Sequence, residues 1–283
     1  MAIRIGCGSW NDSPYARLFR SRTQPDDSPL QAYTRWFDRI ELNVTYHSLQ
    51  PRERIADWVR QTPAGFLFDV KLLKDFSSNP RAAATPLADR FLASIEPIVA
   101  AAKLGAFLLT LAPSFGPKRH RLDELDAVAG KFSPLAPVAV ELRDRAWIEG
   151  DALSTTLAFF RERRFAWVAL DLPRISAPAI LPPIDEVTHP SLAYMRLHGR
   201  NPDYAKVKIA RERHNYAYPD AELGEIAARI RSLAARVANV HVSANNHYRD
   251  FAPKTALALR HSLGESVPAS FPGTTDDQLS FLT

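Results

Sequence analysis

The sequence contains one cysteine, Cys7, in 283 residues. This excludes an internal disulfide and a zinc site built from several cysteines, and it is typical of a protein from a reducing compartment. No apolar run approaches the roughly 20 residues that a membrane-spanning helix requires. The N-terminus has no basic segment followed by a long apolar one, which is the pattern of a signal peptide. We therefore expect a cytoplasmic protein that does not bind a membrane.

Lysine is also scarce, because only eight of the 36 basic residues are lysines and the rest are arginines. The formal net charge is +5 and the isoelectric point is near 9.4, which is compatible with nucleic-acid binding. The arginines are spread along the chain, however, and the sequence has no basic tail. The charge alone does not distinguish a nucleic-acid-binding protein from one with an arginine-rich surface.

Short runs of β-forming residues alternate with segments of helical periodicity along the chain. The predicted strands are Ile3–Cys7, Arg39–Asn43, Phe66–Lys71, Ala106–Thr110, Val138–Glu141, Trp167–Asp171, Leu192–Leu197 and Val240–Ala244. The predicted helices are Arg52–Arg60, Leu87–Lys103, Leu122–Phe132, Asp151–Arg163, Ala221–Val237 and Pro253–His261. Alternation of this kind implies parallel strands, and eight strands predict an α/β protein with one (β/α)8 TIM-like barrel.

The sixth unit of the barrel is the weakest. The Pro-rich stretch Leu172–Pro190 has no helical pattern, so we expect a weak sixth helix or a loop in its place. Asp151 is predicted to cap the helix that it begins. An open doubly wound sheet is the alternative architecture, but Gly6-Cys-Gly8 does not continue into the dinucleotide-binding glycine pattern. We expect residues 1–263 to form the barrel domain and residues 264–283 to form a poorly ordered tail.

Polar residues gather at the carboxyl ends of the predicted strands. In the seventh strand, Tyr194, Arg196 and His198 fall on one face. Both faces of a strand in a parallel barrel are buried, so such residues are expected at the top of the barrel, where the active sites of this fold lie. All the other strands except the fourth, which offers only Thr110, also end in polar or amphipathic residues: Trp10, Glu41, Asn43, Lys71, Glu141, Arg143, Asp171, Asn245 and Asn246.

Several motifs together resemble the DUF72 (YecE-like) family. They are IGCGSW (5–10), ELNVTYH (41–47), LTLAPSF (109–115), ELRDRAW (141–147), RLHGR (196–200), YAYPDAEL (216–223) and SANNHY (243–248). The resemblance extends from Ile5 to about Leu259 and implies a TIM-like barrel of unestablished biochemical function. The family usually has Gln-Leu-Pro-Pro where this chain has Thr110-Leu-Ala-Pro113, and a second aromatic residue at the position of His47. We therefore expect the strand-four wall of the pocket to differ from that of the family.

We expect this end of the barrel to act on a small anionic or sugar-like metabolite by metal-independent acid–base catalysis, without a cofactor. Glu41 and Glu141 would supply the acid and the base, as in a hydrolase, lyase or isomerase. His198 would assist proton transfer, and Lys71 would fix the anion or form a Schiff base. The residues expected to bind the ligand are Trp10, Asn43, Tyr46, Arg143, Trp147, Asp171, Arg196, Arg200, Asn245 and Asn246.

Other interpretations of the same residues stay open. Lys71 could form a structural ion pair with Glu41 on the neighbouring strand. Glu41, Glu141, Asp171 and His198 could together hold a divalent metal ion, but no ligand-spacing motif is present and the nearby cations would repel one. The alternative functions are a nucleic-acid-binding protein or metal-dependent nuclease, and a barrel that binds a ligand without catalysis. The sequence leaves open whether the protein is an enzyme and what its oligomeric state is.

Overall fold

Eight parallel strands surround a common axis in the computed structural model, which describes residues 1–11, 19, 26–177 and 180–265. The strands are β1 (Ala2–Cys7), β2 (Arg39–Leu42), β3 (Leu67–Lys71), β4 (Leu104–Thr110), β5 (Val138–Glu141), β6 (Phe165–Asp171), β7 (Leu192–Leu197) and β8 (Asn239–Ala244). Hydrogen-bonded neighbours follow the order β1-β8-β7-β6-β5-β4-β3-β2. The predicted TIM-like barrel is therefore confirmed, and each predicted strand is present.

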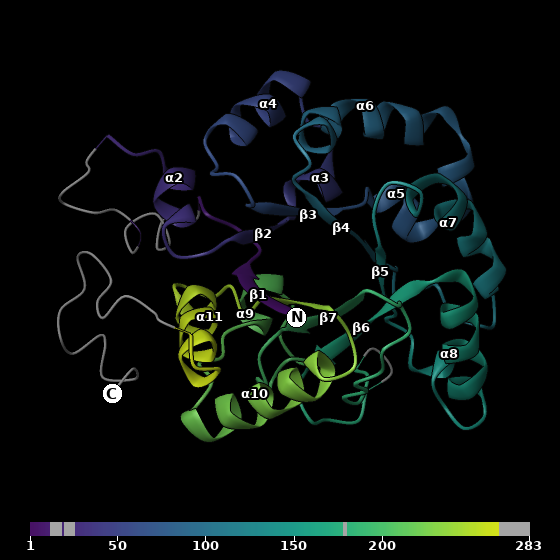
Figure 1. The fold of residues 1–283 in the computed structure, drawn as a ribbon. Helices are drawn as coiled ribbons and strands as arrows, with labels where there is room; N and C mark the ends of the chain where they lie inside the picture. Colours follow the sequence, from purple (N-terminus) through teal and green to yellow (C-terminus); the bar gives the residue numbers. More distant parts are fainter. Residues whose placement is uncertain (12–18, 20–25, 178–179, 266–283) are drawn as a thin grey trace.

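Helices lie outside the strands on all sides of the barrel (Figure 1). The longer ones are α2 (Pro29–Thr34), α4 (Arg52–Arg60), α6 (Pro86–Ala100), α7 (Asp126–Phe132), α8 (Ala152–Arg163), α10 (Asp220–Ala234) and α11 (Phe251–Ser262). Short turns of helix follow several strands: α3 (Val44–His47), α5 (Lys74–Ser78), α9 (Ala210–Arg213) and three 3₁₀ turns at Pro80–Ala84, Leu122–Leu125 and Arg145–Trp147. Among the described helices, none has the length and apolar character needed to cross a membrane.

Two local predictions concern the region between β5 and β7. The described residues between Leu172 and Ser191 contain no helix, so a loop replaces the sixth helix as predicted. Asp151 is the N-cap residue of α8, as predicted, but its side chain makes no capping hydrogen bond. The reason is its backbone, which is already helical at φ −69° and ψ −14°, whereas a capping residue normally has an extended backbone. The predicted tail lies outside the described residues from position 266 onward.

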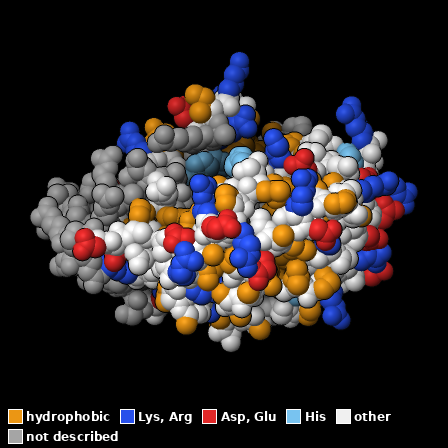
Figure 2. Space-filling model, turned by 90° about the horizontal axis from the view of Figure 1, so that it is seen from above, with side chains coloured by type: hydrophobic (Ala, Val, Ile, Leu, Met, Phe, Trp, Pro, Cys, Tyr) orange, Lys and Arg blue, Asp and Glu red, His pale blue; other side chains and the backbone are white. Residues whose placement is uncertain are grey.

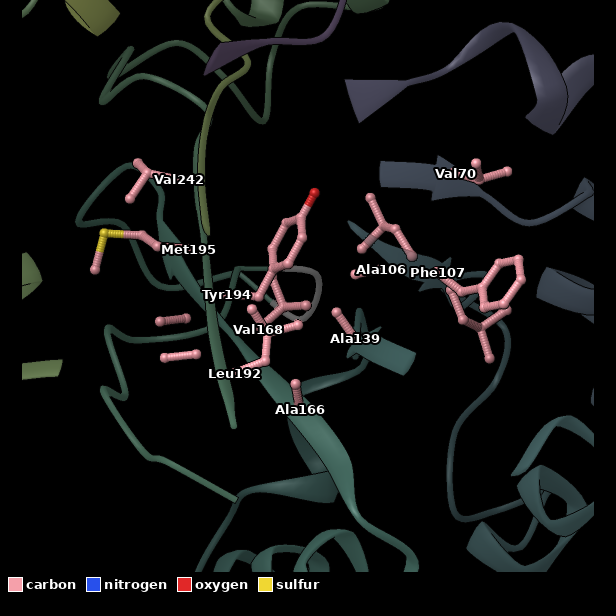
Figure 3. Packing of buried hydrophobic residues seen from close by; sticks show 14 of the residues in the cluster. Val70, Ala106, Phe107, Ala139, Ala166, Val168, Leu192, Tyr194, Met195 and Val242 are labelled. Atoms are coloured by element: carbon pink, nitrogen blue, oxygen red, sulfur yellow. The ribbon is translucent and has the colours of Figure 1, made fainter. Parts of the chain in front are cut away.

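Alternation along the strands separates side chains that face the barrel interior from those that face the helices. Tyr194 points into the barrel interior, whereas Phe107 and Met195 point away from it (Figure 3). All of these residues are buried, because helices cover the outer face of each strand. The alternation therefore decides which polar side chains of a strand reach the interior and which ones contact helices.

Side chains join β1 to β2, because within the described residues no strand pairing connects these two edges of the sheet. The Tyr33 hydroxyl, from α2, accepts a hydrogen bond from the Cys7 amide at 2.9 Å and donates one to the Arg39 carbonyl at 2.8 Å. Gly6 permits this close approach, because a Cβ at that position would collide with the Arg39 carbonyl. Nearer the carboxyl ends, the side-chain amide of Asn43 donates to the Gly8 carbonyl at 3.2 Å. We call this junction the β1–β2 seam.

The β1–β2 seam predicts an unusually large effect for the loss of one hydroxyl. In Tyr33→Phe, the buried Cys7 amide and Arg39 carbonyl each lose a partner, and an unsatisfied buried polar group costs about 1–3 kcal/mol. We expect the free energy of unfolding in urea to fall by at least that amount. Tyr216→Phe is the control, because its hydroxyl bonds to Glu222 at a partly buried position where water can replace it. Equal losses in the two variants would contradict this account of the seam.

Candidate functional site

A cavity of about 910 Å³ opens at the carboxyl ends of the strands. Its volume is within the range of small-molecule sites, about 300–1,000 Å³. The described part of its wall consists of Gly8, Ser9, Trp10, Asn11, Leu42, Asn43, Val44, Tyr46, His47, Arg54, Trp58, Lys71, Arg143, Arg196, His198, Tyr204, Arg213, His214, Asn245 and His247. Eight residues that the sequence predicted for the site are in this wall: Trp10, Asn43, Tyr46, Lys71, Arg143, Arg196, His198 and Asn245.

Asp171 and Arg200 do not line the cavity. Val168 of β6 faces the interior, so Asp171, three positions further on, faces the helices (Figure 3). Its carboxylate accepts hydrogen bonds from Arg200 at 2.7 Å, from Arg229 of α10 at 2.8 Å and from the Tyr218 hydroxyl at 2.8 Å. The sequence could not set this register, because both faces of β6 are apolar before Asp171. The structure therefore places both residues in an ionic cluster against α10 rather than in the pocket.

Trp147 and Asn246 also lie outside the cavity wall, in contacts with other parts of the barrel. The Trp147 indole donates to the Phe115 carbonyl at 2.7 Å, and the two rings stack with centroids 5.8 Å apart. The Asn246 amide donates to the Tyr216 carbonyl and to the Thr255 hydroxyl, both at 2.9 Å. Both side chains bond to other parts of the protein and neither faces the cavity. This arrangement does not favour the ligand-binding role predicted for them.

The guanidinium of Arg196 lies between the two carboxylates that the sequence assigned to catalysis. Its Nε and Nη2 donate to the two oxygens of Glu41 at 3.0 and 2.7 Å, and its Nη1 pairs with Glu141. Arg143 adds a hydrogen bond to Glu141 at 2.7 Å. Arg196 lines the cavity, whereas neither carboxylate does. The Arg196 guanidinium therefore lies between the cavity and the two glutamates, and a ligand in the cavity would contact Arg196 rather than Glu41 or Glu141.

This pairing keeps both glutamates ionised. Burial alone would raise the pKa of Glu41, but the charge and hydrogen bonds of Arg196 bring it down to about 2. Burial opposes ionisation of Glu141 in the same way, and Arg196 and Arg143 hold its pKa well below the ordinary range. A general acid must carry a proton at working pH, and neither glutamate does so. The predicted acid and base pair is therefore not favoured by this geometry.

Glu41 also connects the cavity floor to a buried network deeper in the barrel. The Tyr194 hydroxyl donates to Glu41 at 3.1 Å and accepts from Arg39 at 2.7 Å. The Arg39 Nε donates to Asp69 at 2.7 Å, and the Nδ1 atom of His241 lies 3.0 Å from the same carboxylate. Each carboxylate in this network has an arginine partner, as buried charges require. The floor of the cavity is thus held by contacts that extend through the barrel interior.

Lys71 lines the cavity and is buried, with 9% of its surface exposed. Among the described residues it has no ion pair within 4 Å and no side-chain hydrogen bond; its Nζ lies 4.5 Å from the centre of the Tyr46 ring. The ion pair with Glu41 that the sequence allowed is not formed, because Arg196 occupies that carboxylate. Burial, and next the charge of Arg196, lower the pKa of Lys71 to about 7. A substantial fraction of this amine is therefore uncharged at neutral pH.

Histidine side chains form one side of the cavity wall. The Asn245 amide lies 3.1 Å from His198 Nδ1, which as acceptor would leave the ring proton on Nε2, 3.8 Å from Glu141. Burial lowers the pKa of His198 to about 4, and burial with the neighbouring rings lowers that of His214 to about 2. The rings of His214 and His247 have centroids 4.6 Å apart. His198 and His214 are thus neutral imidazoles at neutral pH, and they can take part in hydrogen bonds as donor and acceptor.

Five lysines and arginines line the cavity, and the described part of the wall includes no aspartate or glutamate. They are Arg54, Lys71, Arg143, Arg196 and Arg213. Within the part of the chain that the structure describes, no group of three or more His, Cys, Asp or Glu residues is placed to hold a metal ion. The metal set considered from the sequence does not converge, because Arg196 separates two members and Asp171 faces the helices.

The cavity residues of α4 and of the connection between β7 and α10 were not predicted from the sequence. Arg54 and Trp58 belong to α4, where Trp58 contacts Trp10 edge to face with centroids 5.1 Å apart. Tyr204, Arg213 and His214 come from the long connection between β7 and α10. Arg54 and Trp58 are four residues apart and so share a helix face, which is the one signal that could have identified them.

Three comparisons place this chain among proteins of one family. The sequence matches the family described as "Protein of unknown function DUF72" over residues 4–277. It is 27% identical over 259 residues to the UPF0759 protein YunF of Bacillus subtilis, a match that spans 87% of this chain and 89% of that protein. A crystal structure of a DUF72 family protein from Enterococcus faecalis superposes with a TM-score of 0.81 at 26% identity, covering 97% of this chain and 100% of that one. A DUF72 family protein from Thermotoga maritima gives 0.77 at 25% identity, with 94% and 100% covered.

The unpaired state of Lys71 predicts that Lys71→Met folds at least as stably as the wild type at pH 7, because it removes a buried charge without separating an ion pair. The folded-state pKa of about 7 lies below the ordinary value of 10.5, so the unfolded chain binds more protons between these values. Wild-type stability contributed by Lys71 therefore rises with pH from about 7 to 10.5, and the variant lacks this rise. Urea denaturation at several pH values in that window measures both effects.

Lys103→Met is the matched control for the Lys71 variant. Lys103 is also buried, but its Nζ donates to the Val59 carbonyl and to the carbonyl and hydroxyl of Thr62 at 2.7–2.9 Å. Its removal leaves these acceptors without a partner, and we expect a loss of about 1–3 kcal/mol. A severe destabilisation by Lys71→Met, comparable to or beyond that of Lys103→Met, would show that Lys71 is a structural counter-ion.

Proposed function

The chain belongs to the DUF72 family of proteins of unknown function, and we propose that it is an enzyme that acts on a small anionic metabolite by metal-independent acid–base chemistry. The supporting observation is the charge of the cavity, which presents five lysines and arginines and, over its described wall, no carboxylate. Such a lining attracts negative charge, and a low-dielectric cavity strengthens that attraction. The sugar-like character that the sequence suggested is compatible with aromatic walls at Trp10, Tyr46 and Trp58.

Arginine side chains are suited to hold the anionic group. A guanidinium donates two parallel hydrogen bonds to a carboxylate or phosphate. Arg54, Arg143 and Arg213 line the cavity without a bidentate carboxylate partner, because Arg143 bonds to Glu141 through Nε alone and Arg213 bonds to the Val207 carbonyl. Their remaining donors are the groups that we assign to the ligand.

Proton transfer is assigned to Lys71, assisted by His198, rather than to the glutamates. A catalytic group works best when its pKa is close to the working pH, and that of Lys71 is about 7. His198 would assist through its neutral ring, which can hold a ligand or a water molecule by a hydrogen bond, because its pKa of about 4 keeps it uncharged at neutral pH. Glu41 and Glu141 act on this assignment as fixed counter-charges that hold Arg196 in place. Removing either would misplace Arg196 instead of removing a proton donor.

Nucleic-acid binding is less well supported than a small ligand. On the face shown in Figure 2, Lys and Arg side chains are interspersed with Asp and Glu instead of forming one block. A duplex is bound by a basic surface that follows its phosphates. The five lysines and arginines described above instead line a cavity of about 910 Å³, which fits a small molecule.

The first test is anion binding by calorimetry, with inorganic phosphate and citrate as probes. We expect Arg143→Gln to weaken binding about tenfold or more, because a hydrogen bond to a charged group contributes about 1.5–3 kcal/mol. The control is Arg163→Gln, which removes an exposed arginine paired with Asp126 on the outer helices. Binding should survive moderate salt, since a buried site is weakly screened. A duplex DNA complex at physiological salt whose affinity falls with a log–log slope near −0.9 per phosphate, without anion binding, would refute the proposal.

The second test separates an enzyme from a binding protein. Phosphorylated sugars and organic acids are incubated with the protein in deuterated water, and NMR follows both turnover and deuterium incorporation. We expect incorporation at carbon for at least one of these compounds, with a rate that rises as pH passes about 7, because Lys71 then loses its proton. Tight binding without turnover or incorporation across the panel would indicate a ligand-binding barrel without catalysis.

A further inference from the structure

We infer that Lys71 is a nucleophile, whose amine condenses with the carbonyl group of an anionic aldehyde or ketone to form an imine. The inference rests on the proposed function, because it takes the cavity as the site of a small anion. It goes further by assigning Lys71 a covalent bond to carbon and by restricting the substrate to carbonyl compounds.

The surroundings of the Lys71 amine carry this inference. The described structure offers it no carboxylate, carbonyl or hydroxyl acceptor within bonding distance, whereas the buried Lys103 has three. Burying an amine without a partner is unfavourable, so packing alone does not explain its presence. The amine nevertheless lines an open cavity, where a ligand can reach it. Tyr46 contacts it through the ring, which leaves the nitrogen lone pair unengaged once the amine is uncharged.

Charge also favours nucleophilic attack at neutral pH. Burial and the neighbouring Arg196 and Arg143 disfavour the ammonium form, and the pKa of Lys71 is lowered to about 7. At pH 7 roughly half of such amines are uncharged, compared with roughly one in 2,500 for a lysine of ordinary pKa. Desolvation and neighbouring cations are the means by which lysines are activated for imine formation.

The same cations define the substrate class. Arg143 and Arg196 line the cavity together with Lys71, so a substrate whose carbonyl reaches Nζ brings the rest of its structure near their guanidinium groups. A carboxylate or phosphate there gains charge-assisted hydrogen bonds. The substrate is therefore a carbonyl compound with an anionic group, either a 2-oxo acid or a phosphorylated aldehyde or ketone.

The bond changes balance without an oxidant or reductant. The Nζ lone pair attacks the carbonyl carbon, and the π electrons of the carbonyl move to oxygen, which takes a proton while nitrogen releases one. The resulting carbinolamine loses water after protonation of its hydroxyl, and the nitrogen lone pair forms the carbon–nitrogen double bond. The sum is an amine, a carbonyl and a proton giving a protonated imine and water. Solvent water that enters the cavity carries the protons in these steps.

Reductive trapping tests the inference. The full chain is incubated with sodium cyanoborohydride and either pyruvate or glyceraldehyde 3-phosphate, and peptide mass mapping locates the secondary amine that reduction of an imine leaves. We expect modification at Lys71 well above that of any other lysine, with a rate that rises through pH 7. It should be absent from Lys71→Met and Lys71→Gln and unchanged at Lys71 in Lys74→Met, which removes an exposed lysine three positions away. Pyruvate alone would identify the 2-oxo acid class, and the triose phosphate alone the phosphorylated class.

The remaining outcomes separate the two proposals. In Arg143→Gln, trapping of the anionic carbonyls should fall about tenfold more than trapping of acetaldehyde, which has no anionic group and responds only to the higher pKa of Lys71. Phosphate or citrate binding without any adduct at Lys71 would refute the imine and leave the anion site intact. Absence of both binding and adduct would refute both. Modification spread evenly over exposed lysines such as Lys74 would also refute the inference, because it would show that Lys71 has no special reactivity.

Discussion

Arg196 determines the electrostatics of the cavity, because its guanidinium binds Glu41 and Glu141 at the same time. By occupying Glu41 it leaves Lys71 without a counter-ion, and its own charge then disfavours the ammonium form of that lysine. By holding both glutamates ionised it removes them from proton transfer. Arg196 therefore contributes both to the positive lining of the cavity and to the lowered pKa of Lys71. Without this interaction, Glu41 would have been the obvious partner of Lys71, and the site would have been an ordinary buried ion pair.

The barrel could be predicted because the alternation of strand and helix repeats along the chain. A wrong assignment of one strand or helix would therefore not change the predicted fold. The cavity end followed from the fold, since polar residues in this fold gather where the strands end. Alternation placed Arg196 and His198 correctly, because β7 has distinct polar and apolar residues near its end. Alternation placed Asp171 wrongly, because β6 is apolar on both faces and its sequence does not show which face points into the barrel. The register of a strand can be inferred from sequence only where its two faces differ.

Pairing between charged residues could not be predicted, because it depends on which side chains reach one another across the barrel. Glu41 was equally available to Lys71 on the next strand and to Arg196 across the interior. A guanidinium, which can donate to both oxygens of a carboxylate, is favoured as its partner over an ammonium group that makes one contact. The network of Arg39, Asp69 and His241 could not be predicted for the same reason, since its members come from three strands, β2, β3 and β8. Sequence patterns give the direction of a side chain but not its partner.

Asn43 belongs both to the β1–β2 seam and to the wall of the cavity. Within the described residues no backbone pairing joins β1 to β2, and Asn43, a side chain that also lines the cavity, is one of those that connect them. A ligand that forms a hydrogen bond with Asn43 would affect the residue that connects β2 to Gly8. Ligand binding and closure of the barrel between β1 and β2 are therefore thermodynamically linked. A bound ligand would therefore stabilise the whole β1–β2 seam, including the parts that it does not contact. The ligand-bound protein would then unfold at a higher temperature and be cleaved more slowly by proteases at this seam.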